Sequence, residues 1–187
     1  MPRVGQKMLS ELVRCAWGKF KELSPILTSR GVSLKLKGKI FKTCVQTVMV
    51  YASETWGVKV EDISKLERTQ SAMVRWMCGV TLKDRKNTEE LQSRLGVEGI
   101  VVVIRYGRLR WFGHIERKDK EDWVSKCRSL EIGGMRGKGR GRKTWNECVK
   151  DDMRTFGLRA VDAQNRAAGD KECGKRQTGA CMEKMTL

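Results

Sequence analysis

The sequence is poor in the residues on which most enzyme sites depend. Its 187 residues include one histidine and two prolines. A Ser-His-Asp or Cys-His arrangement would therefore require His114 itself. Neither a GxxxxGKS/T loop nor a GxGxxG turn after a strand is present, so the common phosphate-binding loops are missing as well. GKGRGRK resembles such a loop only in its glycines.

Long apolar runs are also missing. The longest strongly apolar stretch without a formal charge, Thr43 to Ser53, has about half of the roughly 20 residues that a membrane helix needs. The N-terminal MPRVGQKMLSELVRC lacks the long apolar block of a secretion signal. We therefore expect an intracellular protein, nuclear or cytoplasmic, with no membrane partner.

The seven cysteines include no CxxC pair, and His114 is the sole imidazole that could complement them. A zinc site would need ligands gathered from distant parts of the chain. We expect buried, reduced thiols, with no metal and no cofactor.

Positive charge is what the sequence has in excess. Lys plus Arg number 39 and Asp plus Glu number 22, which gives a net charge of +17 at pH 7. Such a surplus destabilises a compact chain by self-repulsion unless a polyanion neutralises it. The composition therefore favours RNA or DNA, or another acidic surface, as the partner.

Helical periodicity predicts an all-α fold, a helical bundle with a Gly/Arg-rich linker and a separate C-terminal amphipathic helix. Ser33 is the expected N-cap of a helix whose apolar side runs from Leu36 to Ala52. Gly79 and Gly96 are the expected ends of two further helices. Val97 to Ile104 could be a strand by its β-branched residues, and we interpret it as helical because helices surround it. The helices that end at Gly79 and Gly96 are expected to cover 62–78 and 87–95, and another helix is expected over 121–130.

Composition also predicts where the chain divides. Helices up to residue 132 precede the glycine-rich GGMRGKGRG, which predicts a mobile basic linker over 133–143. Thr144 and Glu147 have the spacing of a capping box, which predicts an amphipathic helix over 144–158. Apolar periodicity fades in 159–187, which we expect to be disordered.

Three groups of cations are candidates for phosphate contact. One lies on the polar side of the helix that follows Ser33, where no acidic residue occurs between Glu22 and Glu54. A second is interleaved with Tyr106, Trp111 and Phe112, a mixture that suits phosphate neutralisation and base stacking. The third belongs to the linker, whose glycines leave room for a phosphate chain. The candidates are Lys35, Lys39, Lys42, Arg105, Arg108, Arg110, Arg117, Lys118, Arg136, Lys138, Arg140, Arg142 and Lys143.

For these candidate residues, structural roles without ligand binding remain open as alternatives. The linker could be a solvated loop or a localisation signal. Trp111 and Phe112, like most of the six tryptophans, are expected in the core, and His114 is expected to be structural. Lys37 falls on the apolar side of its helix, where its stem would carry the amine outward to water.

Asp151 and Asp152 raise the alternative of a magnesium-dependent polymerase or nuclease. Adjacent residues on a helix point about 100° apart, whereas metal-binding aspartates usually converge from a strand or hairpin with a third carboxylate. We therefore expect no catalysis by this chain. A further alternative is a structural fragment whose cationic face docks on an acidic protein.

Five blocks of the sequence, in order and spacing, resemble the C-terminal part of endonuclease–reverse transcriptases of RTE-like non-LTR (LINE-type) retrotransposons. The likeness covers roughly Leu12 to Leu158. The blocks are AWGKFKELSPILTSRGVSLKLKGKIF (16–41), VYASETW (50–56), LERTQSAMVRWMCGVTLKDRK (66–86), GRLRWFGHIERKD (107–119) and GRGRKTWNECVKDDM (139–153).

The resemblance implies that residues up to about Trp56 belong to the helical thumb and the remainder to a C-terminal extension, which divides the helical part into 1–57 and 58–132. It implies a parent RNA-directed DNA polymerase whose palm and endonuclease domains this chain lacks, and the departure from the family pattern after Leu158 suggests a truncated element. On this basis the helix of Lys35, Lys39 and Lys42 would cradle a template–primer duplex. The linker and the 105–118 stretch would hold template RNA or target DNA.

Overall fold

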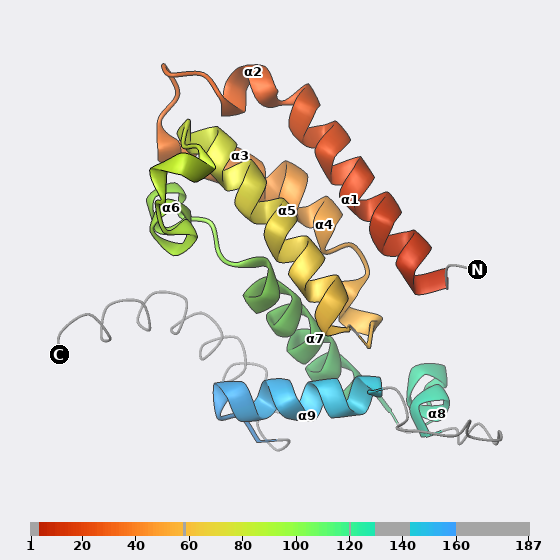
Figure 1. Ribbon diagram of the computed structural model, residues 1–187. Coiled ribbons are helices and arrows are strands. Elements are labelled where there is room, and N and C mark those ends of the chain that lie inside the picture. Colours follow the sequence, from red (N-terminus) through yellow and green to blue (C-terminus); the bar gives the residue numbers. More distant parts are fainter. Residues whose placement is uncertain (1–3, 58, 120, 130–142, 160–187) are drawn as a thin grey trace, which may run out of the picture. The chain divides into compact units, whose positions relative to one another are not determined.

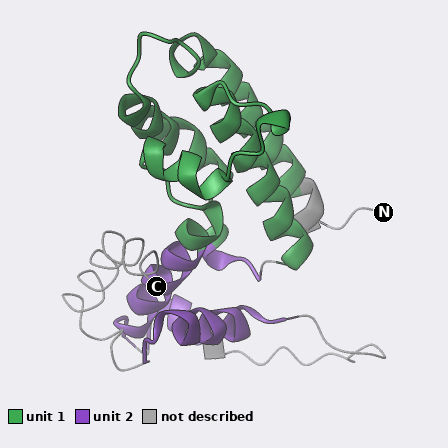
Figure 2. Cartoon of the chain, turned by 60° about the vertical axis from the view of Figure 1, so that its left-hand side comes forward, with its two compact units in different colours: residues 1–53, 58–104 green, residues 54–57, 105–187 purple. Residues whose placement is uncertain are grey.

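The computed structural model describes residues 4–57, 59–119, 121–129 and 143–159 (Figure 1). These residues form helices and turns and contain no strand, which confirms the all-α prediction. Their contacts define two compact units, the first with residues 1–53 and 58–104, the second with 54–57 and 105–187 (Figure 2). The division between the units falls within a helix near residue 104. The predicted boundary at 132, with nearly all of the predicted linker and tail, lies outside the described residues.

Unit 1 is a bundle in which consecutive and distant helices pack together. α1 packs against α4 and α5, while α3 packs against α2, α5 and α6. A π-helical turn, η1 (Lys42–Gln46), joins α3 to α4 without a break. The helices of this unit are α1 (Val4–Glu22), α2 (Ser24–Leu27), α3 (Leu34–Phe41), α4 (Thr47–Met49), α5 (Val60–Cys78) and α6 (Thr88–Leu95), with a 3-10 turn, η3, at Leu82–Asp84.

Helix boundaries follow the signals in the sequence. Ser33 Oγ accepts the Leu36 N–H at 3.4 Å, and Asn87 Oδ1 accepts the Glu89 N–H at 3.1 Å. Gly79 and Gly96 end α5 and α6 with φ of 64° and 65°, the left-handed conformation that glycine adopts without strain. The N-caps and C-terminal glycines expected here are thus confirmed.

The apolar side expected after Ser33 is only partly buried. Phe41, Val45 and Met49 are fully enclosed, whereas Leu36 and Tyr51 are 49% and 70% exposed. Tyr51 lies beyond the end of α4, where the helix stops at Met49 and the continuous helical wheel no longer applies. The π-helical turn also alters the angular spacing of the residues around it.

The tryptophans do not fill the core as expected. None of the six is buried, and Trp76 and Trp123 are 49% and 79% exposed. Phe20 occupies the centre of unit 1, and Trp17 and Trp76 pack on it with ring centroids at 5.7 and 5.5 Å. A large ring at the rim of a small core keeps one side in water. Of four methionines expected in the core, Met49, Met73 and Met77 are buried, whereas Met8 is 41% exposed.

Lys37 is buried, which contradicts the expectation that its amine reaches water. The residue is 4% exposed, and its Nζ donates a hydrogen bond to the Met77 carbonyl at 3.2 Å. Met77 lies in the last turn of α5, where carbonyls lack helical partners and the helix dipole is negative. The helix end therefore compensates the cation inside the protein.

The expected helix over Val97 to Ile104 is confirmed only from Ile100, where α7 (Ile100–Glu116) begins, and Val97 to Gly99 precede it outside any helix. The buried side chain of Gln70 fixes its start, because Oε1 accepts the Ile100 N–H at 2.6 Å and Nε2 donates to the Glu98 carbonyl at 2.8 Å. Gln46 donates to the same carbonyl at 3.0 Å. Two glutamines from distant helices thus satisfy the backbone at this turn.

Unit 2 contains α7 from Arg105 onward, α8 (Trp123–Ser129), α9 (Trp145–Phe156) and the Glu54–Gly57 segment at the end of the 3-10 turn η2 (Ser53–Thr55). Thr144 and Glu147 form the expected capping box, and Gly157 ends α9. Rather than standing separate, α9 packs on α7, with Phe156 stacked on Tyr106 at 4.7 Å and Trp145 next to Phe112 at 6.3 Å. None of the described helices has the length and apolarity to cross a membrane.

Replacing Gly38 with alanine should destabilise the protein. The new Cβ would lie 2.8 Å from the carbonyl carbon of Leu95 and closer still to its oxygen, where backbone cannot yield easily. We expect a loss of about 1–3 kcal/mol or more in urea unfolding, typical of overpacking. Gly18, also within a helix, has open space around it, so Gly18→Ala should gain up to ~1 kcal/mol. Equal stability of the two variants would contradict this close approach.

Candidate nucleic-acid interface

Three exposed lysines form a ridge on unit 1. Lys35 and Lys39 lie on α3 and Lys42 on η1, at intervals that keep them on one side of a helix. At 1.5 Å per residue the ridge is about 10 Å long. No carboxylate of the described residues pairs with any of the three, and the sequence has no acidic residue between Glu22 and Glu54. We call these residues the lysine ridge.

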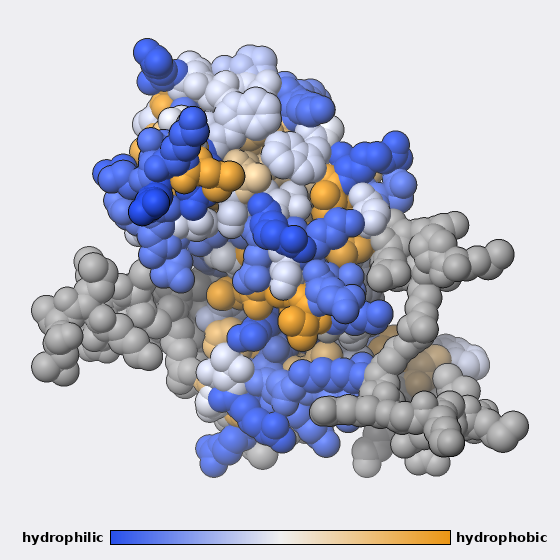
Figure 3. Space-filling view, viewed as in Figure 1, coloured by the Kyte–Doolittle hydropathy of each residue, from blue (hydrophilic) through white to orange (hydrophobic). Residues whose placement is uncertain are grey.

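The surface of unit 1 around its helices is largely polar on the face shown in Figure 3, where hydrophilic side chains are blue. Apolar atoms, in orange, appear there as small patches between them. Such a surface suits contact with a solvated, charged partner better than burial against an apolar one.

Arg108 does not belong to the binding surface, although the sequence placed it there. The residue is 3% exposed, and its Nε donates to Asp152 Oδ2 at 2.6 Å while Nη1 donates to the Trp56 carbonyl at 3.2 Å. Arg105 lies 3.6 Å from the other oxygen of the same carboxylate. Burial raises the pKa of Asp152, and the two guanidinium groups oppose that shift. Arg108 is therefore part of the fold of unit 2.

Asp151 and Asp152 point toward different partners. Asp151 pairs with Lys143 and, at 3.1 Å, with Arg154, whereas Asp152 is held by Arg108. The hydrogen bond from Lys143 lowers the pKa of Asp151. No group of three or more His, Cys, Asp or Glu side chains in the described residues is arranged to hold a metal ion. Because cations occupy both carboxylates, the pair lacks the convergence that a magnesium site needs.

Of the other candidate residues, some are exposed, some pair with a carboxylate and some lie outside the residues that the structure describes. Arg110 and Arg117 are exposed, while Lys118 pairs with Asp122 at 2.8 Å. That hydrogen bond lowers the pKa of Asp122. Lys143 is exposed but paired with Asp151. The linker cations Arg136, Lys138, Arg140 and Arg142 lie outside the described residues.

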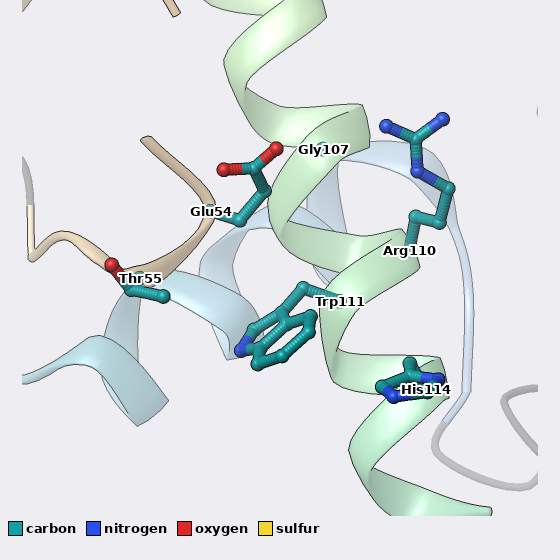
Figure 4. A pocket seen from close by; sticks show the side chains of 6 residues that line it. All are labelled: Glu54, Thr55, Gly107, Arg110, Trp111 and His114. Carbon is teal, nitrogen blue, oxygen red and sulfur yellow. The ribbon is translucent and has the colours of Figure 1, made fainter. Parts of the chain in front are cut away.

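A cavity of about 320 Å³ lies within unit 2, beside α7 and the end of η2 (Figure 4). It is lined by Glu54, Thr55, Gly107, Arg110, Trp111 and His114. The sequence predicted a binding role for Arg110 only. The other lining residues of α7 could have been predicted from their helical spacing. That spacing places Gly107, Arg110, Trp111 and His114 on one face of the helix. Nothing in the sequence placed Glu54 beside them.

The described cysteines are free thiols, but few are buried. Cys148 is buried in unit 2, whereas Cys15 and Cys127 are exposed. Cys78 is partly covered, and burial raises the pKa of its thiol against the opposing charges of Lys37 and Arg94. Cys173 and Cys181 lie outside the described residues. The expectation of buried thiols therefore holds for Cys148 and is wrong for Cys15 and Cys127.

Comparison with protein-family models, with curated proteins and with solved structures finds no match for this chain. The resemblance to retrotransposon reverse transcriptases therefore stays a prediction, and function is inferred from the side chains and their surroundings.

Removing one partner of the buried Arg108–Asp152 pair should destabilise unit 2 strongly. Asp152→Asn leaves the guanidinium buried without its counter-charge, so we expect a loss of about 3–5 kcal/mol in urea unfolding. The double variant Arg108→Met, Asp152→Leu should recover most of this loss, because it removes both buried charges and leaves only the partly exposed Arg105 without its carboxylate. Asp151→Asn, which alters an exposed pair on the same helix, should cost far less. Similar losses for Asp151→Asn and Asp152→Asn would contradict the structural role of Arg108.

Acid should weaken unit 2 through Asp151. Because its pKa is lower in the folded chain than the ordinary value of 3.8, its ion pairs stabilise the fold fully above that value. This contribution is lost as pH falls from 3.8 through the lower folded pKa. Thermal unfolding followed from about pH 5 to about pH 2 should show a smaller decline in Asp151→Asn than in the original chain. An identical decline in both would show that the pair contributes nothing.

Proposed function

We propose that this chain is a non-catalytic nucleic-acid-binding protein that holds the sugar–phosphate backbone of RNA or DNA on the lysine ridge. The observation that carries this proposal is the ridge itself, which is exposed, linear and without acidic partners among the described residues. Lysine at an exposed position is a mobile point charge that suits phosphate oxygens without selecting a base sequence.

The dimensions of the ridge suit a backbone. Its length of about 10 Å corresponds to roughly three phosphates at 3.4 Å of axial rise per strand. Contacts of this kind release condensed counterions, so that affinity depends on salt and tolerates sequence changes. The ridge therefore fits a continuous polyanion better than a single acidic side chain.

The net charge supports the same assignment. A charge of +17 is costly in an isolated compact chain, and a phosphate backbone neutralises it by many weak contacts. The resemblance to the thumb of RTE-like reverse transcriptases is also compatible, because it gives the lysine ridge a template–primer duplex as its partner. In such a parent protein the polymerase palm would supply the catalysis.

The salt dependence of binding tests the proposal. With roughly 6–10 phosphate contacts, the affinity of the chain for a short duplex should fall by about 10³–10⁵ between 50 and 200 mM salt. The triple variant Lys35→Gln, Lys39→Gln, Lys42→Gln should bind more weakly at low salt, and its slope of log affinity against log salt should be smaller by about 2–3. Fluorescence anisotropy with labelled duplex measures both quantities.

Lys59, Lys83 and Lys86 supply a matched control. All three are exposed lysines of unit 1, so replacing them with glutamine removes the same charge from other places. An equal loss in both triple variants would mean that only bulk charge matters, against the proposal.

Stronger binding of poly-glutamate than of duplex would favour an acidic protein as the partner. Primer extension with magnesium that is abolished by Asp151→Asn, the variant expected to keep the fold, would show catalysis and overturn the non-catalytic assignment.

A further inference from the structure

The cavity in unit 2 brings together a carboxylate, a guanidinium and an aromatic surface. Glu54 is half-buried, and within the described part of the chain its carboxylate has neither an ion pair nor a hydrogen-bond donor. In Figure 4 the carboxylate lies next to Gly107, and a Cβ at that position would lie 3.4 Å from the Glu54 Cγ. The absence of a side chain at Gly107 therefore lets Glu54 lie close against α7.

The aromatic part of the cavity comes from two stacked rings. Trp111 is half-exposed, and His114, one helical turn further along, stacks on it with centroids 5.3 Å apart and planes at 28°. Arg110 also lines the cavity and is exposed, and in Figure 4 its guanidinium projects from the other side of α7 from Glu54 and Trp111. It has no carboxylate partner among the described residues. At about 320 Å³ the cavity is at the lower end of ligand pockets, large enough for one nucleotide.

These groups match the chemistry of a single guanine nucleotide. A carboxylate offers two acceptors side by side, and the Watson–Crick edge of guanine offers two adjacent donors, N1–H and the N2 amino group. Adenine, cytosine and uracil each lack that pair of donors. An indole supplies a stacking surface for a base, and arginine pairs with a phosphate.

A cationic peptide side chain is the competing ligand, since it could also use Glu54 and Trp111. Arg110 in the same lining would repel it, as would the net charge of +17. Both features attract a nucleotide. The observations therefore favour the nucleotide.

We propose that this cavity binds an unpaired guanine of a single-stranded segment, with Glu54 accepting the two N–H donors, Trp111 stacking on the base and Arg110 pairing with the phosphate. The inference rests on the proposed function in taking its ligand from the same nucleic acid. It adds base selectivity that the lysine ridge does not have. Because the guanine must present its Watson–Crick edge to Glu54, the site excludes base-paired guanine.

Substitution of inosine for guanine tests the site, because inosine lacks only the N2 amino group. We would compare uridine oligomers of about ten nucleotides carrying one central guanine or one inosine, by fluorescence anisotropy with the full chain. The original chain should bind the guanine oligomer about tenfold more tightly, the usual effect of losing one hydrogen bond to a charged group. Glu54→Gln, with one acceptor in place of two, should remove the difference between the guanine and inosine oligomers.

Glu61→Gln is the matched control, since Glu61 is an exposed glutamate outside unit 2 whose loss changes the net charge equally. It should keep the preference for guanine. The lysine-ridge variant should weaken both oligomers by the same factor. Equal affinity for guanine and inosine in the original chain, or a preference that persists in Glu54→Gln, would overturn the site.

Failure of the site and failure of the proposed function remain distinguishable. If oligomer binding shows no dependence on salt or on the lysine ridge, guanosine and inosine monophosphates still test the cavity through the NMR shift of the Trp111 indole N–H. A shift that favours guanosine and is lost in Glu54→Gln supports the site without the ridge. An arginine peptide that binds more tightly than either nucleotide, and loses affinity in Glu54→Gln, would instead show a peptide site and overturn the inference.

Discussion

The surplus of positive charge constrains how this chain can fold. A cation that leaves water must meet an internal acceptor, because an uncompensated buried charge costs several kcal/mol. Among the described residues both buried cations obey this rule by different means. Lys37 donates to a carbonyl at the C-terminal end of α5, and Arg108 is held by Asp152 and the Trp56 carbonyl. A carbonyl at a helix end in unit 1 and a carboxylate in unit 2 therefore compensate the two buried cations.

The same constraint determines which cations are free for a ligand. Three aspartates of unit 2 are already engaged, since Asp151 and Asp152 pair with lysine and arginine, as does Asp122 with Lys118. The lysine ridge lies in a stretch of sequence with no acidic residue, so nothing nearby along the chain neutralises it. The exposed cations without carboxylate partners on the lysine ridge follow from this uneven distribution of carboxylates more than from the number of basic residues.

Local rules predict the helices well and tertiary partners poorly. Ser33, Asn87 and the capping box at Thr144 act within a few residues, so their sequence spacing is sufficient to predict helix starts. Lys37 depends on the end of α5, and Glu54 depends on a glycine of α7, both far away along the sequence. These partners depend on how the helices pack together, and the periodicity of the sequence carries no information about that packing. The exposure of Trp76 has the same cause, since Phe20 of another helix is fully buried in unit 1 and Trp76 packs on its ring.

Helix α7 shows why residue type alone does not identify a binding residue. Arg108 and Arg110 belong to one basic cluster in the sequence, but two residues along a helix correspond to a rotation of about 200°. Arg108 consequently points into unit 2 and pairs with Asp152, while Arg110 is exposed and lines the cavity. Because Gly107 has no side chain, Glu54 lies close against the exposed side of α7. The same helical turn therefore contains a buried residue of the structural ion pair and residues that line the cavity. A cluster of arginines is therefore informative only after each member has been assigned to a side of its helix.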